Sequence, residues 1–412
     1  MSWDKVKIGD CCDITSSKRI FYSEYVEKGV PFYRSKEIIE CSQGHSISEP
    51  LFITEQKYNE IKAKFGVPSE GDLLLTSVGT IGIPYIVKDT DYFYFKDGNL
   101  TWFRNFRKNL LSRYLYYWIK SADGQSILNN TTIGSSQKAL TILALKNINI
   151  PLPPIAVQQK IVSILSAYDD LIENSRKQIK LLEEAAQRLY REWFVNMRFP
   201  GHEDTAIVDG VPEGWKIQKF DEVFDYVRGK SYSSKELSDS EGILMVNLKN
   251  IRAFGGYKRN VEKRYIGPYN ANHTLQAGDI IMGVTDMTSE RRLVGHVAIV
   301  PNFGQKAIFS MDLIKLIPKQ ISRSFLYSAM FYGGYSKKIS QLANGVNVLH
   351  LKPEAIMNME MLIPPETIIN IYDEFFTQIQ GKIEILQTQN NLATEARDRL
   401  LPKLMSGEIE YN

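Results

Sequence analysis

The 412-residue sequence has little of what marks a secreted, membrane-bound or metal-dependent protein. Its three cysteines, Cys11, Cys12 and Cys41, form no CxxC pair, and an odd count with two adjacent members fits neither a zinc site nor a disulfide framework. No apolar run approaches the roughly 18 residues of a membrane span, and the N-terminal residues lack the apolar core of a signal peptide. We therefore expect a cytoplasmic protein with reduced thiols and no membrane contact.

The sequence also lacks recognisable catalytic motifs. Its five histidines show no HExxH spacing, and it contains neither an Asn-Pro-Pro-aromatic tetrapeptide nor a glycine-rich strand-turn-helix for S-adenosylmethionine. Gly229-Lys230-Ser231 resembles part of a phosphate-binding loop, but Phe224 stands where the first glycine belongs. Asp72 and Asp279 are interpreted as turn residues before strands and not as nuclease carboxylates. We expect no catalytic residue, no metal site and no cofactor in this chain.

Composition describes a folded protein without identifying its partner. A hydrophobic content of 43% and a charged content of 24% are ordinary for a globular protein, and the length suits at least two domains. The formal net charge of +3 is too small to indicate a polyanionic partner by itself. Evidence for nucleic-acid binding must therefore come from local features.

The second half of the chain repeats the first with an offset near 211 residues, found by comparing the two halves directly. Glycine-led segments recur in the same order: GVPFYRSKEI from Gly29 and GILMVNLKNI from Gly242, GDLLLT from Gly71 and GDIIMG from Gly278, GIPYIV from Gly82 and GHVAIV from Gly295. The halves begin alike at Trp3 and Trp215, and each ends in a proline pair, Pro153-Pro154 and Pro364-Pro365. The chain is therefore a duplicated unit.

Each unit combines strands and helices. Short β-branched and aromatic runs bounded by glycine, proline and aspartate predict strands, and Asp97-Gly98 and Asn344-Gly345 are typical tight-turn pairs. Leu111–Leu128 and Ile321–Leu342 predict helix. This pattern indicates an α+β domain whose topology the sequence does not define.

A long helix is predicted after each proline pair. Apolar residues recur with spacings of four and three at Ile161, Leu165, Tyr168, Ile172, Ile179, Leu182, Ala186, Leu189 and Trp193, with Ser175 interrupting. The C-terminal seam is Tyr372, Phe376, Ile379, Ile383, Leu386, Asn390, Ala393, Arg397 and Leu400. Such a helix would be roughly 60 Å long. We expect the two helices to pair antiparallel as a coiled coil, while packing of each helix on its own domain alone remains the alternative.

The predicted organisation is thus two tandem homologous α/β domains, at 1–154 and 200–365, related by a pseudo-twofold internal repeat. They are separated by a central helix at 155–199 and a C-terminal helix at 366–412. A buried Asn390 could fix the register of the helix pair, or it could be a solvated residue on a frayed helix. Two unequal domains on one spacer suit two different short DNA sequences, since major grooves on one face recur roughly every 34 to 36 Å.

The sequence resembles the specificity subunits of type I restriction-modification enzymes over nearly its whole length. The most specific matches are INIPLPPIAVQQKIVSIL from Ile148, preceded by GSSQKAL, and RLLPKLMSGEI from Arg399. The resemblance implies two target-recognition domains that each read one half of an asymmetric bipartite site in double-stranded DNA. It also implies helices that dock methyltransferase subunits, expected to number two, and restriction or motor subunits in the full complex. S-adenosylmethionine, ATP and Mg are then expected on the partner subunits.

Polar loops that differ between the matched halves are the candidate DNA-reading residues, because arginine pairs with guanine, asparagine and glutamine with adenine, and lysine more often with phosphate. They are Lys18, Arg19, Tyr33, Arg34, Lys36, Ser77, Thr80, Ser135, Ser136, Gln137 and Lys138 in the first half, and Arg228, Lys230, Asn247, Lys249, Asn250, Thr285, Arg291, Arg292, Asn344, Asn347 and His350 in the second. Each alone could equally be a solvated loop residue. Tyr22 and Tyr232 are interpreted as packing residues.

Two other functions remain open at this point. A scaffold whose duplicated domains bind proteins would show no sequence-dependent affinity for DNA. A free-standing nuclease or methyltransferase would be active as the isolated chain. The duplication, the paired seams and the terminal motifs together favour the recognition subunit.

Overall fold

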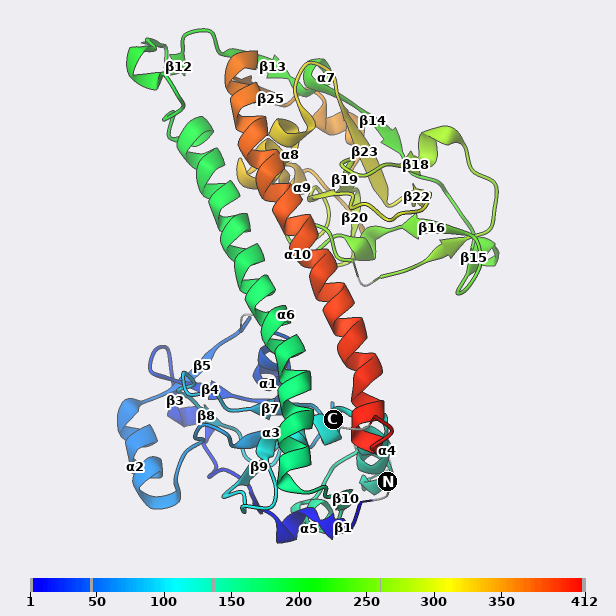
Figure 1. Cartoon of the computed structure of the whole chain (residues 1–412). Helices are drawn as coiled ribbons and strands as arrows, with labels where there is room; N and C mark the ends of the chain where they lie inside the picture. Colours follow the sequence, from blue (N-terminus) through cyan, green and yellow to red (C-terminus); the bar gives the residue numbers. More distant parts are fainter. Residues whose placement is uncertain (1–2, 45–46, 135–137, 260, 410–412) are drawn as a thin grey trace. The chain divides into compact units, whose positions relative to one another are not determined.

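The computed structural model (Figure 1) describes residues 3–44, 47–134, 138–259 and 261–409. The chain forms two compact units, one made of residues 1–177 and 387–412 and the other of residues 178–386. Two long helices are each divided between the units: α6 (Ile155–Tyr190), which continues in a π-helical turn to Val195, and α10 (Glu366–Ser406). Each unit therefore contains one domain and a segment of both helices.

The first unit contains two four-stranded sheets and a two-stranded pair. The strand order β2-β9-β6-β7 joins Asp13–Thr15, Leu100–Arg104, Leu73–Thr76 and Pro84–Ile86, all antiparallel. The order β3-β5-β4-β8 joins Tyr25–Val26, Leu51–Ile53, Val30–Tyr33 and Tyr94–Phe95, with β4 and β8 parallel. β1 (Lys5–Lys7) pairs with β10 (Asn149–Pro151), and the helices are α1 (Ser35–Ser42), α2 (Glu55–Phe65), α3 (Ser112–Lys120), α4 (Ala122–Thr131) and α5 (Ile142–Lys146).

The second unit repeats the strand order of both four-stranded sheets and of the two-stranded pair, and adds further strands. The order β14-β23-β19-β21 joins Phe224–Arg228, Leu313–Pro318, Ile280–Gly283 and Val297–Ile299. The order β15-β17-β16-β22 joins Leu237–Ser238, Arg264–Tyr265, Ile243–Val246 and Ala307–Phe309, again with one parallel pair, and β18 (Thr274–Leu275) extends it. β13 (Lys216–Lys219) pairs with β25 (Glu360–Ile363), β11 (Ile207–Val208) with β12 (Val211–Pro212), and β20 (Thr285–Asp286) with β24 (Leu349–His350); the helices are α7 (Phe220–Val223), α8 (Arg323–Tyr332) and α9 (Tyr335–Ser340). The predicted duplication and α+β fold class are confirmed.

Recurring Gly-Asp pairs directly precede β6 and β19, which are inner strands of the sheets β2-β9-β6-β7 and β14-β23-β19-β21. Gly71 and Gly278 have φ angles of 83° and 85°, in the left-handed region that glycine adopts at little cost. Asp72 then accepts hydrogen bonds from the backbone N–H of Ser69 at 3.0 Å and from the indole of Trp102 at 2.8 Å. These aspartates are turn residues, as predicted, and the strands that follow are completely buried.

The two long helices contact each other within each unit. In the first unit Ile161 and Leu165 of α6 lie in one buried core with Leu401 and Leu404 of α10 and with residues of the first domain. In the second unit Tyr190 of α6 and Tyr372 of α10 share a buried core, with ring centroids 6.3 Å apart. The contacting positions run in opposite directions along the two helices, so the pairing is antiparallel. Each helix packs on its own domain as well as on its partner helix.

Every predicted seam position is buried or half-buried in the structure. Arg397, a charged member of the C-terminal seam, forms an ion pair with Asp169 of α6 at 2.7 Å, and Asp169 also accepts a hydrogen bond from Tyr117 at 2.7 Å. Asn390 lies within the continuous helix α10, and its Oδ1 is buried with no hydrogen-bond partner among the described residues. The interpretation of Asn390 as part of a frayed helix end is therefore wrong.

Among the described residues, no helix is both long enough and apolar enough to cross a membrane.

Candidate nucleic-acid interface

A turn between two strands of the first domain gathers three segments that are far apart in the sequence. This turn, Lys96–Asn99, joins β8 to β9. The N–H of its glycine donates to Ser16 Oγ at 3.4 Å, and its aspartate pairs with Arg19 at 2.9 Å. Its asparagine carbonyl accepts from the backbone N–H of Ser77 at 2.8 Å and from the Ser35 hydroxyl at 3.4 Å. Candidate positions that follow β2, β4 and β6 in the sequence therefore lie close together around the Lys96–Asn99 turn.

The equivalent turn of the second domain does the same. Ser310–Asp312 joins β22 to β23, and its methionine N–H donates to the Lys230 carbonyl at 2.9 Å. Its serine N–H donates to the Val246 carbonyl at 2.9 Å, directly before Asn247. Its aspartate accepts from the Thr285 hydroxyl at 3.1 Å. Sequence reasoning noted only Asp97-Gly98 as a turn and missed that these two turns organise the interface.

One more paired segment completes each site. In the first domain Ala139 bridges both Val78 and Ile133, which brings Ile133 and Ala139 against the loop after β6. In the second domain His350 pairs with Thr285 and with Asn344, so the loop 344–350 lies against the loop after β19. Each domain therefore contains the same three-part frame: the turn (Lys96–Asn99 or Ser310–Asp312), the loops that contact this turn, and the segment paired with the loop after β6 or β19. The side chains on the frame differ between the two domains.

The frame presents some of the candidate residues to solvent and buries others. Lys18, Arg19, Lys36, Thr80, Lys138, Arg228, Lys249, Arg292, Asn344, Asn347 and His350 are exposed, whereas Tyr33, Arg34, Lys230, Thr285 and Arg291 are half-buried. Ser77, Asn247 and Asn250 are buried. Ser135, Ser136 and Gln137 lie outside the described residues.

Arg34 and Asn247 occupy the same structural position, the residue that caps the turn after the parallel strand. The backbone N–H of Arg34 donates to Glu37 at 2.6 Å, and its guanidinium pairs with the same buried carboxylate at 2.5 Å. The backbone N–H of Asn247 donates to Asn250 Oδ1 at 2.9 Å, and the Asn250 amide donates to the Val261 carbonyl at 2.9 Å. These contacts assign the side chains of Arg34 and Asn250 to holding their loops, and Asn250 is not available to a base in this conformation.

Two further candidates are held by neighbours inside the fold. The buried hydroxyl of Ser77 lies 2.7 Å from the hydroxyl of Thr101 on β9. Tyr33 stacks on Phe93 with centroids 4.4 Å apart, and burial raises the pKa of its phenol to about 12. Both side chains therefore stabilise the site through contacts inside the fold.

Most of the candidate cations are exposed and weakly held. Lys36 pairs with Glu49 at 2.9 Å, and Arg228 pairs with Glu354 at 2.7 Å. A backbone N–H, together with Arg228 and the Tyr226 hydroxyl, lowers the pKa of Glu354 to about 2. Exposed ion pairs contribute little free energy, so phosphate groups can replace these carboxylates.

The loop after β19 is held rigidly by one buried carboxylate. Asp286 accepts from the backbone N–H groups of Thr288, Leu293 and Val294 at 2.7, 2.6 and 3.2 Å. Burial raises the pKa of Asp286, but these hydrogen bonds lower it more, and the net shift is downward. Arg291 donates to the Ser340 carbonyl at 2.6 Å, which anchors the loop to the end of α9.

One sequence-based interpretation of an aromatic residue is wrong. Tyr22 is 89% exposed, so it is not a packing residue, because the turn that carries it points its ring away from the domain core. Tyr232 is half-buried beneath the ammonium group of Lys263, as expected for a packing residue.

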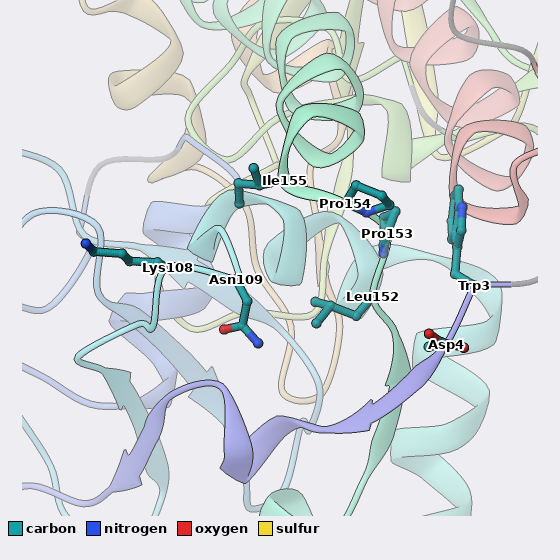
Figure 2. Close-up of a pocket in the computed structure, with 8 residues that line it drawn as sticks. All are labelled: Trp3, Asp4, Lys108, Asn109, Leu152, Pro153, Pro154 and Ile155. Atoms are coloured by element: carbon teal, nitrogen blue, oxygen red, sulfur yellow. The ribbon is translucent and has the colours of Figure 1, made fainter.

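The structure describes no arrangement of residues typical of catalysis. No three histidine, cysteine, aspartate or glutamate side chains are grouped as metal ligands in the parts of the chain that the structure describes. An open hollow of ≈ 630 Å³ lies where Lys108–Asn109 meets Pro153–Ile155 and the Trp3 ring. Figure 2 shows its two charged side chains, Asp4 and Lys108, on opposite sides of the view. The other lining residues are mainly apolar, and Leu152–Ile155 among them lead into α6.

Comparisons with known proteins agree with this duplicated frame. The model described as "Type I restriction modification DNA specificity domain" matches residues 1–184 and 212–395. Two specificity subunits from Methanocaldococcus jannaschii, those of the type I restriction enzymes MjaIX and MjaVIII, are 26% and 24% identical, with 99% of this chain and 93% of each relative covered. The solved S subunit of a type I restriction-modification system from M. genitalium shares the fold, with a TM-score of 0.64 at 16% identity over 98% of this chain and 96% of that one. The chain belongs to the type I restriction-modification DNA specificity family, the non-catalytic, sequence-recognising subunits of these enzymes.

Proposed function

We propose that each domain reads one half of an asymmetric bipartite site in double-stranded DNA. The observation that carries this proposal is the three-part frame, which is built twice with different side chains. Identical frames give both domains the same way of approaching a duplex, and different side chains give them different sequence preferences. Two half-sites of different sequence follow from this arrangement.

Base reading falls to the exposed polar side chains of the loops and paired segments. In the second domain these are Asn344, Asn347 and His350, beside Arg292. Asparagine can pair with adenine through two hydrogen bonds, and arginine with guanine. In the first domain the same role falls to Thr80 and to Ser135, Ser136, Gln137 and Lys138.

Phosphate contact falls to the exposed cations at the edges of each frame. Lys18, Arg19 and Lys36 serve the first domain, and Arg228 and Lys249 the second. Lysine and arginine neutralise phosphates without regard to sequence, so these contacts position the duplex against the reading loops.

Methyltransferase subunits, two in number, dock on the long helices, and restriction or motor subunits join in the full complex. Large apolar side chains outside the helix seam support this: in the first unit Leu171 and Leu392 are 46% and 61% exposed, and in the second Leu181 and Ile385 are 63% and 54% exposed. Apolar side chains at such positions favour binding of another protein. S-adenosylmethionine, ATP and Mg then belong to the partner subunits, and the complex works in the cytoplasm.

The test is methylation mapping of host DNA with this chain and its methyltransferase expressed together, compared with each expressed alone. We expect a split asymmetric motif only when both are present. The absence of any motif, with the partner methylating DNA unaided, would contradict the proposal and favour a protein-binding scaffold.

Domain exchange then assigns the half-sites. Replacing residues 1–154 by the corresponding domain of a relative should change one half of the motif and leave the other intact. The variant Asn347→Ala/His350→Ala should reduce sequence preference only in the other half of the motif. A change in both halves from either experiment would contradict modular reading.

A further inference from the structure

Two neighbouring aromatic rings protrude from the first domain. Phe21 is 61% exposed and Tyr22 is 89% exposed, and they stand at the start of a 3₁₀ turn, Tyr22–Glu24. Single exposed apolar residues are common on protein surfaces, but two adjacent rings on one turn are a concentrated apolar surface. We call residues 21 and 22 the aromatic tip.

Hydrogen bonds hold the backbone of the turn that carries the aromatic tip. The backbone N–H of Phe21 donates to the Glu24 carboxylate at 2.7 Å, and the N–H of Glu24 donates back to the Phe21 carbonyl at 2.9 Å. Lys57 of α2 pairs with Glu24 at 2.6 Å, and the Tyr22 and Tyr25 rings meet edge-on with their centroids 5.7 Å apart. Because the backbone is already held, binding through this turn costs little backbone conformational entropy.

The second domain builds the same turn without the rings. Ser233 and Ser234 stand where the first domain has Phe21 and Tyr22, and the backbone N–H of Ser233 donates to Glu236 at 2.7 Å in the same capping arrangement. Since the turn forms equally well with serine, the two rings are not needed to fold it. Their presence in one domain only points to a role in what that domain binds.

The aromatic tip ends a segment that begins inside the candidate interface. The segment comprises residues 16–22. Ser16 accepts a hydrogen bond from the Lys96–Asn99 turn, and Arg19 forms an ion pair with the aspartate of that turn. It carries two cations, Lys18 and Arg19, and no acidic residue. Glu24, the acid beside the tip, is already engaged by Lys57.

We propose that the aromatic tip is a DNA-contacting element of the first domain, which places the rings of Phe21 and Tyr22 against bases in or next to the first half-site. This inference rests on the proposed function and adds an apolar specificity element to it. A cationic segment that ends in aromatic rings matches the chemistry of duplex DNA, whose phosphates attract the cations and whose major groove presents the apolar methyl groups of thymine. A protein partner is the alternative that the test must exclude.

The test compares DNA selectivity of the complex of this chain with its methyltransferase. The variant Phe21→Ser/Tyr22→Ser copies the second domain, and Leu143→Ser, a 72% exposed residue on α5 of the same domain, is the matched control. Equilibrium binding is measured on duplexes with the full mapped motif, with the first half-site scrambled and with the second half-site scrambled.

We expect the double variant to bind the full site roughly 5- to 150-fold more weakly, the range expected when recognition of one base pair of a duplex site is lost. Preference for the intact first half-site should fall, preference for the intact second half-site should persist, and Tyr22→Phe and Leu143→Ser should bind like the wild type. Unchanged selectivity with a normal methylation motif would overturn this inference alone. Loss of methyltransferase binding with unchanged DNA affinity would assign the aromatic tip to a protein partner, and absence of any motif would overturn the proposed function with it.

Discussion

The first turn of helix α6 contains a glutamine whose side chain joins the helix to the first domain. Gln158 is completely buried, and its amide donates to the carbonyls of Asn109 at 2.8 Å and Pro153 at 2.9 Å. Its carbonyl accepts from the backbone N–H of Leu111 at 2.9 Å, immediately before α3. One side chain thus satisfies three backbone groups at the point where helix, strand β10 and loop meet.

The substitution Gln158→Leu keeps the side chain's approximate volume and removes all three hydrogen bonds. Each bond contributes about 1 kcal/mol net, and a buried backbone group left without a partner costs about 1–3 kcal/mol. Burial of the added apolar surface offsets part of this loss, so we expect the free energy of unfolding to fall by about 3 kcal/mol. For a unit of about 200 residues that corresponds to a fall in Tm of roughly 6–12 °C.

The measurement is thermal unfolding by differential scanning calorimetry. The matched control is Gln159→Leu, the same substitution at the next residue of the same helix, where the side chain is exposed. The control should change Tm by less than about 2 °C, since surface substitutions usually stay within about 0.5 kcal/mol. Equal Tm changes for the two variants would refute the reasoning.

Three further predictions follow from single contacts. Asp286→Asn should lower Tm at pH 7, and the gap to the wild type should close as the pH falls below about 3.9, because a carboxylate with a lowered folded pKa stabilises only while ionised; a gap independent of pH would contradict this. Asp169→Asn removes one of the two carboxylates that pair with the half-buried guanidinium of Arg397, leaves the more exposed Asp398, and should cost about 2 kcal/mol in chemical unfolding, whereas the exposed neighbour Asp170→Asn should not. Lys249→Ala should weaken DNA binding equally on all sequences and reduce the slope of log affinity against log salt by about 1, measured by fluorescence anisotropy of the complex.

Several features could be predicted because they depend on local residue type and spacing. The Gly-Asp pairs require a left-handed glycine before a buried strand, and that requirement appears twice in the sequence. The seam of α6 and α10 follows from the apolar period, and all its predicted positions are buried or half-buried. The helices after each proline pair begin at Ile155 and Glu366, where the proline ring no longer interferes with helix geometry.

The roles of individual polar residues could not be predicted in the same way. Asn250 has base-reading chemistry, yet its amide is used by the backbone of residues 258 and 261. Arg34 likewise reaches a buried glutamate three residues on, while Tyr22, an aromatic residue expected to pack, is exposed. Which polar group meets a backbone partner and which meets solvent depends on contacts between segments far apart in the chain.

The sequence by itself determined the duplication, the α+β character of each half, the long paired helices and the family, because residue order, periodicity and turn chemistry are local properties that survive divergence. Tertiary structure alone decided which segments converge on the Lys96–Asn99 and Ser310–Asp312 turns, and which of their side chains remain free to meet DNA. The physical reason is that β-sheet pairing joins residues tens of positions apart, and burial then engages some of their polar groups and exposes others.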